Sequence, residues 1–135
     1  MLNIDTTQML IELTRGDAAS IVFSAVDGSG QAWNPSATTD SITFAVAKKF
    51  GGTPLMEITN VYDGTDPPTT TSLENFWTIN IGTNDWLDDD GNDKFKFSDY
   101  VWDCQITTST GSDTIIGKTD DITPTFRVWG EVAEE

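Results

Sequence analysis

The chain has 135 residues, a length that fits one domain around one hydrophobic core. It carries 22 acidic and 7 basic residues, and its formal net charge of −15 argues against a nucleic acid or an anionic membrane surface as its partner. The sequence has no His, which excludes histidine-dependent catalysis and removes the commonest protein ligand for metals.

Short segments in which apolar residues alternate with polar ones recur along the chain, and each ends at Gly, Pro, Asn or Asp. In the first half of the chain they predict four strands, at residues 9–14, 19–26, 42–47 and 56–62. In the fourth strand we expect Met56, Ile58 and Tyr62 to face the core. Residues 63–72 are rich in Pro and Thr and predict a surface loop.

The second half of the chain predicts four more strands. Trp77, Ile79 and Ile81 alternate in a fifth strand, and a short helical turn is expected near Trp86. The strongest alternation predicts a sixth strand whose inward residues are Tyr100, Trp102, Cys104 and Ile106. A turn at 109–112, a short strand at 114–117 and a last strand containing Phe126, Val128 and Val132 complete the set.

These elements predict an all-β fold, an antiparallel β-sandwich of about seven to nine strands that forms a single domain over residues 1–135. Cys104 is the only cysteine, so no disulfide can form within the chain. Residues 1–8 do not resemble a secretory signal, and no segment approaches the roughly 20 apolar residues of a membrane-spanning helix. We therefore expect a soluble protein made in a reducing cytoplasm.

The acidic segment at residues 85–93 resembles a calcium loop in composition, because Ca²⁺ prefers several oxygen ligands within a short stretch. If Gly91 held the sixth loop position, Trp86 and Phe97 would fall where the first and last acidic ligands are required. The spacing therefore favours a solvated acidic turn, with a non-helical calcium site as the alternative. We predict no cofactor.

Other motifs favour structural interpretations. Arg15-Gly16-Asp17 matches an integrin-binding tripeptide, but its place between two predicted strands favours a tight turn. Cys104 has no His to activate it and is expected in the core. No pair among the 22 acidic residues is singled out as a pair of catalytic carboxylates, so no catalytic residue is predicted and we expect no enzymatic activity.

The tryptophans are the candidates for an interaction surface. Trp77 and Trp102 should be buried, whereas Trp129 is out of phase with Phe126 and Val128 and should be exposed. An exposed Trp often marks a protein interface, so Trp129 is the first candidate interface residue and Trp33 the second. The same aromatic residues could instead stack on sugars.

Several segments together resemble the N-terminal domain of phage baseplate upper proteins. They are the opening strand with the Arg15-Gly16-Asp17 turn, the next strand with its Asp-Gly-Ser-Gly turn, the strand that ends at Lys49, and Tyr100-Val101-Trp102-Asp103-Cys104 before Gly111. The likeness covers most of the chain, which departs from it in the loop at 63–72 and the acidic insertion at 85–93. The resemblance implies an immunoglobulin-like sandwich without enzymatic activity.

The resemblance also implies a function. We expect a structural protein of a phage or prophage particle, in a tail, baseplate or capsid surface, assembled in the host cytoplasm with other virion proteins and with copies of itself. Because the chain ends at Glu135 without a receptor-binding or shaft region, a small separate component of the virion is expected. The alternative is a bacterial surface adhesin domain or a carbohydrate-binding module, since sandwich folds also host these functions.

Overall fold

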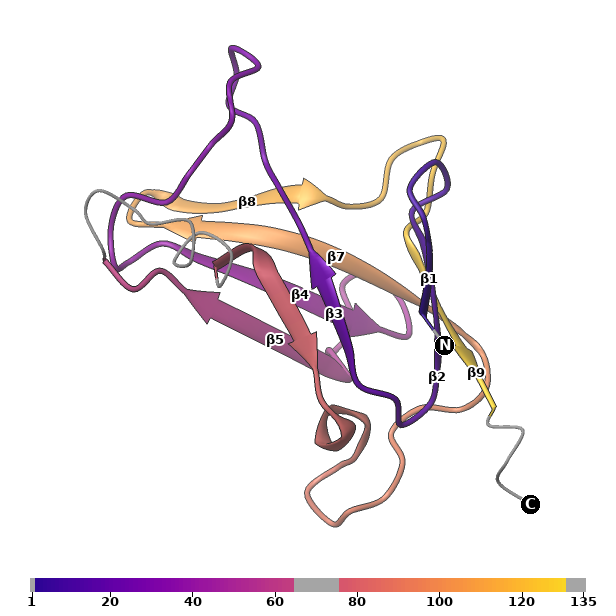
Figure 1. The fold of residues 1–135 in the computed structure, drawn as a ribbon. Coiled ribbons are helices and arrows are strands. Elements are labelled where there is room, and N and C mark those ends of the chain that lie inside the picture. Colours follow the sequence, from indigo (N-terminus) through magenta and orange to yellow (C-terminus); the bar gives the residue numbers. More distant parts are fainter. Residues whose placement is uncertain (1, 65–75, 131–135) are drawn as a thin grey trace.

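The computed structural model describes residues 2–64 and 76–130, and these residues form nine strands and one 3₁₀ turn (Figure 1). The strands are β1 (Leu2–Asp5), β2 (Leu10–Thr14), β3 (Ala19–Val22), β4 (Ser41–Ala47), β5 (Met56–Val61), β6 (Thr78–Ile81), β7 (Asp99–Thr108), β8 (Gly111–Ile116) and β9 (Thr125–Trp129). The turn η1 spans Thr83–Trp86, where the sequence predicts a short helical turn. No helix within these residues is long and apolar enough to cross a bilayer.

The strands form two sheets of unequal size. The large sheet has the order β1-β2-β9-β7-β4-β5, with β8 paired to β7 as well, and the small sheet contains β3 and β6. The small sheet lies across one face of the large one (Figure 1), which confirms the predicted all-β sandwich. All pairs are antiparallel except β2 and β9, which run parallel, so the large sheet is mixed.

Three elements differ from the prediction by more than one residue. Strand β1 was not predicted, because its four residues are all exposed and give no inward alternation. The strand predicted at 19–26 is shorter, since β3 ends at Val22 and Val26 instead forms an isolated bridge with Ala32. The turn predicted at 109–112 is tighter, because Gly111 and Ser112 already pair with β7.

Some predicted segments cannot be compared with the structure. The loop at 63–72 lies largely outside the described residues, and so does Val132 of the predicted last strand.

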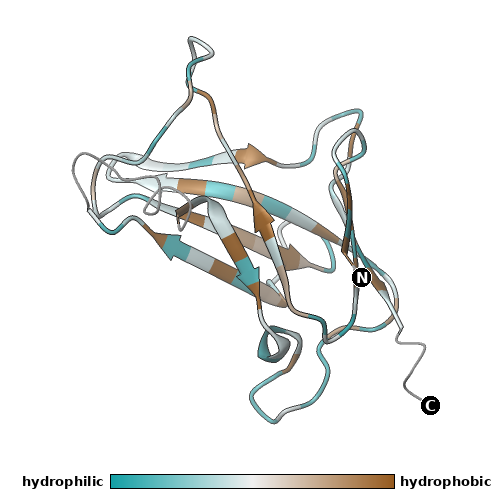
Figure 2. Cartoon of the chain, in the orientation of Figure 1, coloured by the Kyte–Doolittle hydropathy of each residue, from teal (hydrophilic) through white to brown (hydrophobic). Residues whose placement is uncertain are grey.

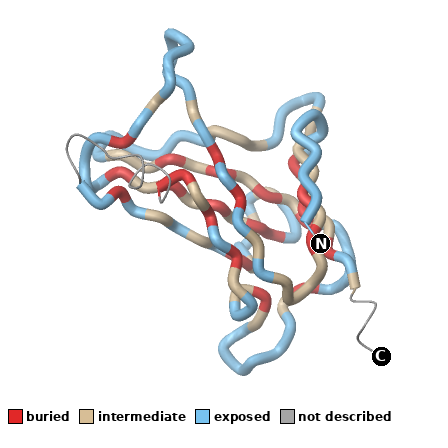
Figure 3. The backbone as a smooth tube through the Cα atoms, viewed as in Figure 1, coloured by how far each residue is buried: buried red, intermediate tan, exposed pale blue. Residues whose placement is uncertain are grey.

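The core lies between the sheets and contains the residues that alternation placed there. The four inward residues predicted for β7 are all buried, as are Met56 and Tyr62, while Ile58 is partly buried against the same cluster. Figure 3 shows the buried positions concentrated where the sheets face each other. Asn60 of β5 donates a hydrogen bond to the Thr78 carbonyl of β6, which also connects the two sheets.

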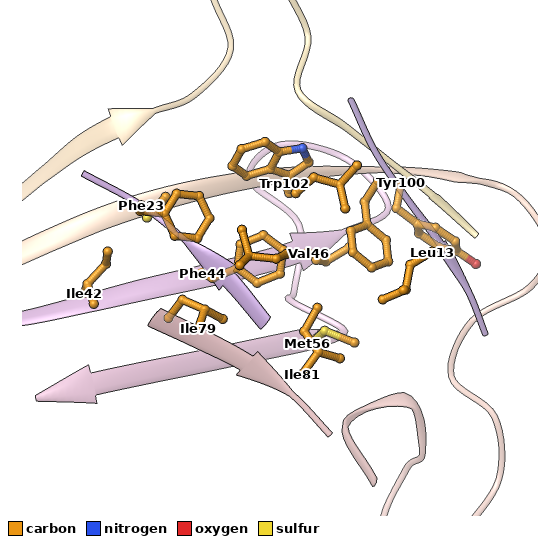
Figure 4. Packing of buried hydrophobic residues seen from close by; sticks show 14 of the residues in the cluster. Leu13, Phe23, Ile42, Phe44, Val46, Met56, Ile79, Ile81, Tyr100 and Trp102 are labelled. Atoms are coloured by element: carbon orange, nitrogen blue, oxygen red, sulfur yellow. The ribbon is translucent and has the colours of Figure 1, made fainter. Parts of the chain in front are cut away.

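Three aromatic rings join the sheets at the centre of the core. Phe23 follows β3, Phe44 lies on β4 and Trp102 lies on β7, and their centroids are 5.7 to 6.0 Å apart, with tilted planes (Figure 4). Such tilted contacts are favourable beyond the area that they bury. In antibody domains a disulfide between the sheets packs against a Trp at the core. Here aromatic packing holds the sheets together without a disulfide.

Tyr100 fixes the entry to β7. Its hydroxyl accepts a hydrogen bond from the Lys96 backbone N–H at 2.7 Å, four residues earlier in the chain. A Tyr near the start of a strand whose hydroxyl bonds the backbone a few residues upstream also occurs in immunoglobulin-like sandwiches. Trp102 connects β7 to the start of β2, because its indole N–H donates to the Met9 carbonyl at 3.0 Å.

We predict that Phe44→Ala lowers the free energy of unfolding by about 3 to 5 kcal/mol, because it removes a fully buried ring and leaves a cavity among its aromatic neighbours. Urea unfolding followed by circular dichroism measures this loss. Thr43→Ala is the matched control, since Thr43 faces outward on the same strand and bonds only the exposed Thr59 hydroxyl. Equal losses in the two variants would contradict the central role of the ring cluster.

Candidate functional site

Trp129 lies at the end of β9 on the outer face of the large sheet. Alternation along β9 turns Phe126 and Val128 inward and Arg127 and Trp129 outward. The Trp129 side chain is 45% exposed, which confirms the predicted exposure. Its indole N–H donates to Glu12 Oε2 at 2.9 Å, so the ring is held in one orientation on the surface.

Polar contacts continue from Trp129 across four strands. Glu12 on β2 also accepts a hydrogen bond from Asn3 on β1 at 2.9 Å. Arg127 on β9 donates two hydrogen bonds to Asp99 on β7, at 2.8 and 3.1 Å, and its guanidinium lies 3.9 Å from Glu12. We call these five residues, Asn3, Glu12, Asp99, Arg127 and Trp129, the Trp129 surface.

The hydrogen bonds of the Trp129 surface favour the charged forms of its carboxylates. The hydrogen bonds from Asn3 and then Trp129 lower the pKa of Glu12, and the hydrogen bond from Arg127 lowers the pKa of Asp99. Asp99 in turn raises the pKa of Arg127. At neutral pH the surface therefore presents two carboxylates and one guanidinium in fixed positions around an indole.

A second exposed aromatic residue lies beside this surface. Phe97 is 57% exposed, and a Cβ added at Gly130, the residue after Trp129, would lie 3.1 Å from its ring. Arg15 lies over the Phe97 ring, 4.2 Å from its centroid, and pairs with Asp93 at 3.3 Å. Phe97 therefore lies next to the residue that follows β9, and Arg15 covers one side of its ring.

The contacts of Arg15 also explain the Arg15-Gly16-Asp17 motif. Gly16 has a φ of 90°, and the Asp17 N–H donates to the Thr14 carbonyl, so the motif forms the predicted tight turn. The Arg15 guanidinium donates to the Phe95 carbonyl at 3.1 Å. The arginine of this turn therefore holds the segment that leads into β7.

Trp33, the second candidate interface residue, is only partly buried and packs against the core. Its ring lies 6.3 Å from that of Phe76 and 6.1 Å from that of Trp77. These residues precede β6, whereas Trp129 contacts β2, so the structure does not bring the two candidates into one site. Trp86, in the turn η1, is fully buried.

Within the acidic segment, the Asp88 carboxylate closes a turn. Asp88 accepts hydrogen bonds from the backbone N–H groups of Asp90 and Asn92, both at 2.9 Å. Gly91 takes a φ of 82°, which the turn requires. In residues 2–64 and 76–130 no group of three or more acidic or Cys side chains is arranged to hold a metal ion.

Several members of the Trp129 surface were not predicted from the sequence. Alternation in residues 9–14 would place Glu12 outward, but only the pairing of β2 with β9 brings it to Trp129. Likewise, the opposition of Asp99 and Arg127 depends on the register of β7 and β9. No family model, curated protein or solved structure matches this chain. A functional assignment must therefore rest on its own residues.

We predict that Cys104 does not react with a thiol reagent at pH 8 until the protein unfolds. Its side chain is fully buried, which confirms the expected core position, and burial raises the pKa of the thiol to about 12. The rate of reaction with an aromatic disulfide reagent, with and without urea, measures this protection. Rapid reaction of the folded protein would contradict it.

We predict that the Trp129 indole N–H signal shifts with a midpoint below pH 4.5, the ordinary pKa of Glu. Because the hydrogen bonds lower the pKa of Glu12 in the folded protein, they are fully present above pH 4.5 and are lost as the pH falls through the lowered value. A pH titration by NMR checks this. Glu12→Gln should abolish the shift, and a midpoint above 4.5 would contradict the arrangement.

Proposed function

We propose that this chain is a non-enzymatic structural protein of a phage or prophage particle and acts by binding other virion proteins and copies of itself. The observation that carries the proposal is the exposed Trp129, held by Glu12 and surrounded by the paired charges of Asp99 and Arg127. The resemblance of the turn and strand motifs to phage baseplate domains is the reason for proposing a phage particle as the assembly.

The arrangement suits protein binding for two physical reasons. Trp and Arg are the residues that most often dominate binding energy at protein interfaces. Side chains already held in place lose less conformational entropy on binding than free ones do. Trp129 is fixed by Glu12 and Arg127 by Asp99, so both are ordered before a partner arrives.

The alternative function is a surface adhesin or a carbohydrate-binding module. It is favoured by one observation, the exposed indole of Trp129 beside the Glu12 and Asp99 carboxylates. An aromatic face can cover the apolar side of a sugar ring while the carboxylates accept its hydroxyl hydrogen bonds.

We predict that an antibody to this chain labels intact particles in electron micrographs of a lysate in which the gene is expressed.

Trp129→Ala should weaken binding to purified particle components about 30-fold, the loss of a central aromatic anchor worth about 2 kcal/mol. Val61→Ala is the matched control, since Val61 is 61% exposed on β5. Unlabelled particles would contradict the proposal, and glycan binding lost in Trp129→Ala would favour the alternative.

A further inference from the structure

The small sheet has an open edge at β3. Among the described strands β3 pairs only with β6. The Phe23 N–H donates to the Trp77 carbonyl at 2.9 Å, and hydrogen-bonded pairs alternate along an antiparallel ladder. Ile21 and Phe23 therefore direct their backbone groups toward β6. Val22 and its neighbours two residues away direct theirs toward the open side.

An apolar groove of about 200 Å³ runs beside this edge, between β3 and the β1–β2 ladder. Its main apolar lining consists of Ile4, Met9, Ile11, Ile21, Phe23 and Trp102. Pockets for drug-sized molecules are larger, roughly 300 to 1,000 Å³. The groove is therefore suited to the side chains of an extended peptide.

The groove exists because the large sheet extends past the small one on this side. Leu2 and Ile4 of β1 pair with Leu13 and Ile11 of β2 and share their inward face. Leu13 and Ile11 are buried, but Leu2 and Ile4 remain 40% and 43% exposed. A strand added to β3 would stand over this uncovered margin. Figure 2 shows brown, apolar residues toward the carboxyl end of β3.

Charge distinguishes the possible occupants. Residues 18–26 carry no charge and no Pro, so the β3 edge lacks the Lys and Pro residues that protect free edges. The charges nearest to this edge in the sequence are acidic, since Asp17 and Asp27 border the uncharged run. Asp5 is one of the residues that line the groove, and Asp113 lies beside Val26. A second copy would bring the same acids together, whereas a basic segment would be attracted.

We infer that the β3 edge binds an extended segment of a partner protein in which apolar side chains alternate and Lys or Arg residues flank them. The segment pairs with the outward backbone groups of Val22 and its neighbours, places its apolar side chains in the groove, and sets its basic residues against the nearby acids. This inference rests on the proposed function, because it states how another particle protein would attach.

The test uses the full chain and a fluorescent peptide in which Val and Thr alternate between terminal pairs of Lys. We expect saturable binding in anisotropy titrations. Two control peptides should bind at least about tenfold more weakly: one has alternate amides methylated, which blocks strand pairing, and the other has Glu in place of Lys. A peptide that fails to bind, or that binds equally well when methylated, would overturn the inference.

Variants of the chain test the same edge. Val22→Pro removes an N–H that points away from β6, and Val22→Lys adds a repelling charge at a side chain that is 71% exposed. Each should weaken binding at least about tenfold, while Val61→Lys, the same charge change on β5, should not. Thermal unfolding shows whether each variant is folded. If Val22→Pro does not fold, the peptide affinity of Val22→Lys tests the inference instead.

Two further results are informative. One would assign the β3 edge to a different occupant, and the other distinguishes a failure of this inference from a failure of the proposed function. Dimerisation of the wild type that Val22→Lys abolishes would assign the edge to a second copy and overturn the inference. Particle labelling does not depend on the peptide, so labelled particles together with a failed peptide titration would overturn this inference alone.

Discussion

Contact between Phe23, Phe44 and Trp102 is the interaction on which the two-sheet arrangement depends. A two-stranded sheet is at best marginally stable alone in water, so β3 and β6 persist only because they pack on the large sheet. With Cys104 as the only cysteine, no disulfide within the chain can share this task. The rings, together with the other buried residues of both sheets, therefore supply the apolar burial that holds the sheets together.

The unequal sheets have a consequence for the surface. Six strands in the path of the large sheet face two in the small one, so within residues 2–64 and 76–130 no strand covers part of the inward face of β1 and β2. Natural sheets usually protect such margins with charged side chains. Here the charge is strong but lies around the margin, as at Asp5 and Asp27, and the strand itself is neutral. Repulsion between copies can thus disfavour self-association through this edge, while the edge stays open to a partner of opposite charge.

The sequence predicted those parts of the structure that alternation encodes. In β7, every second residue from Tyr100 to Ile106 is buried, as expected from a period of two. Strand β1 was missed because it buries no residue and is defined only by its partner β2. The parallel pairing of β2 and β9 was also beyond prediction, since alternation shows which face a residue takes but not which strand lies beside it.

The same limit applies to the candidate surfaces. The exposure of Trp129 followed from its phase against Phe126 and Val128, but its hydrogen bond to Glu12 joins residues 117 positions apart. Strand β2 then connects the two surfaces, because Glu12 faces Trp129 on the outer side and Ile11 lines the groove on the inner side. A partner protein that contacted both surfaces would hold the subunit on two sides at once, and two weak contacts on one subunit can together give firm attachment.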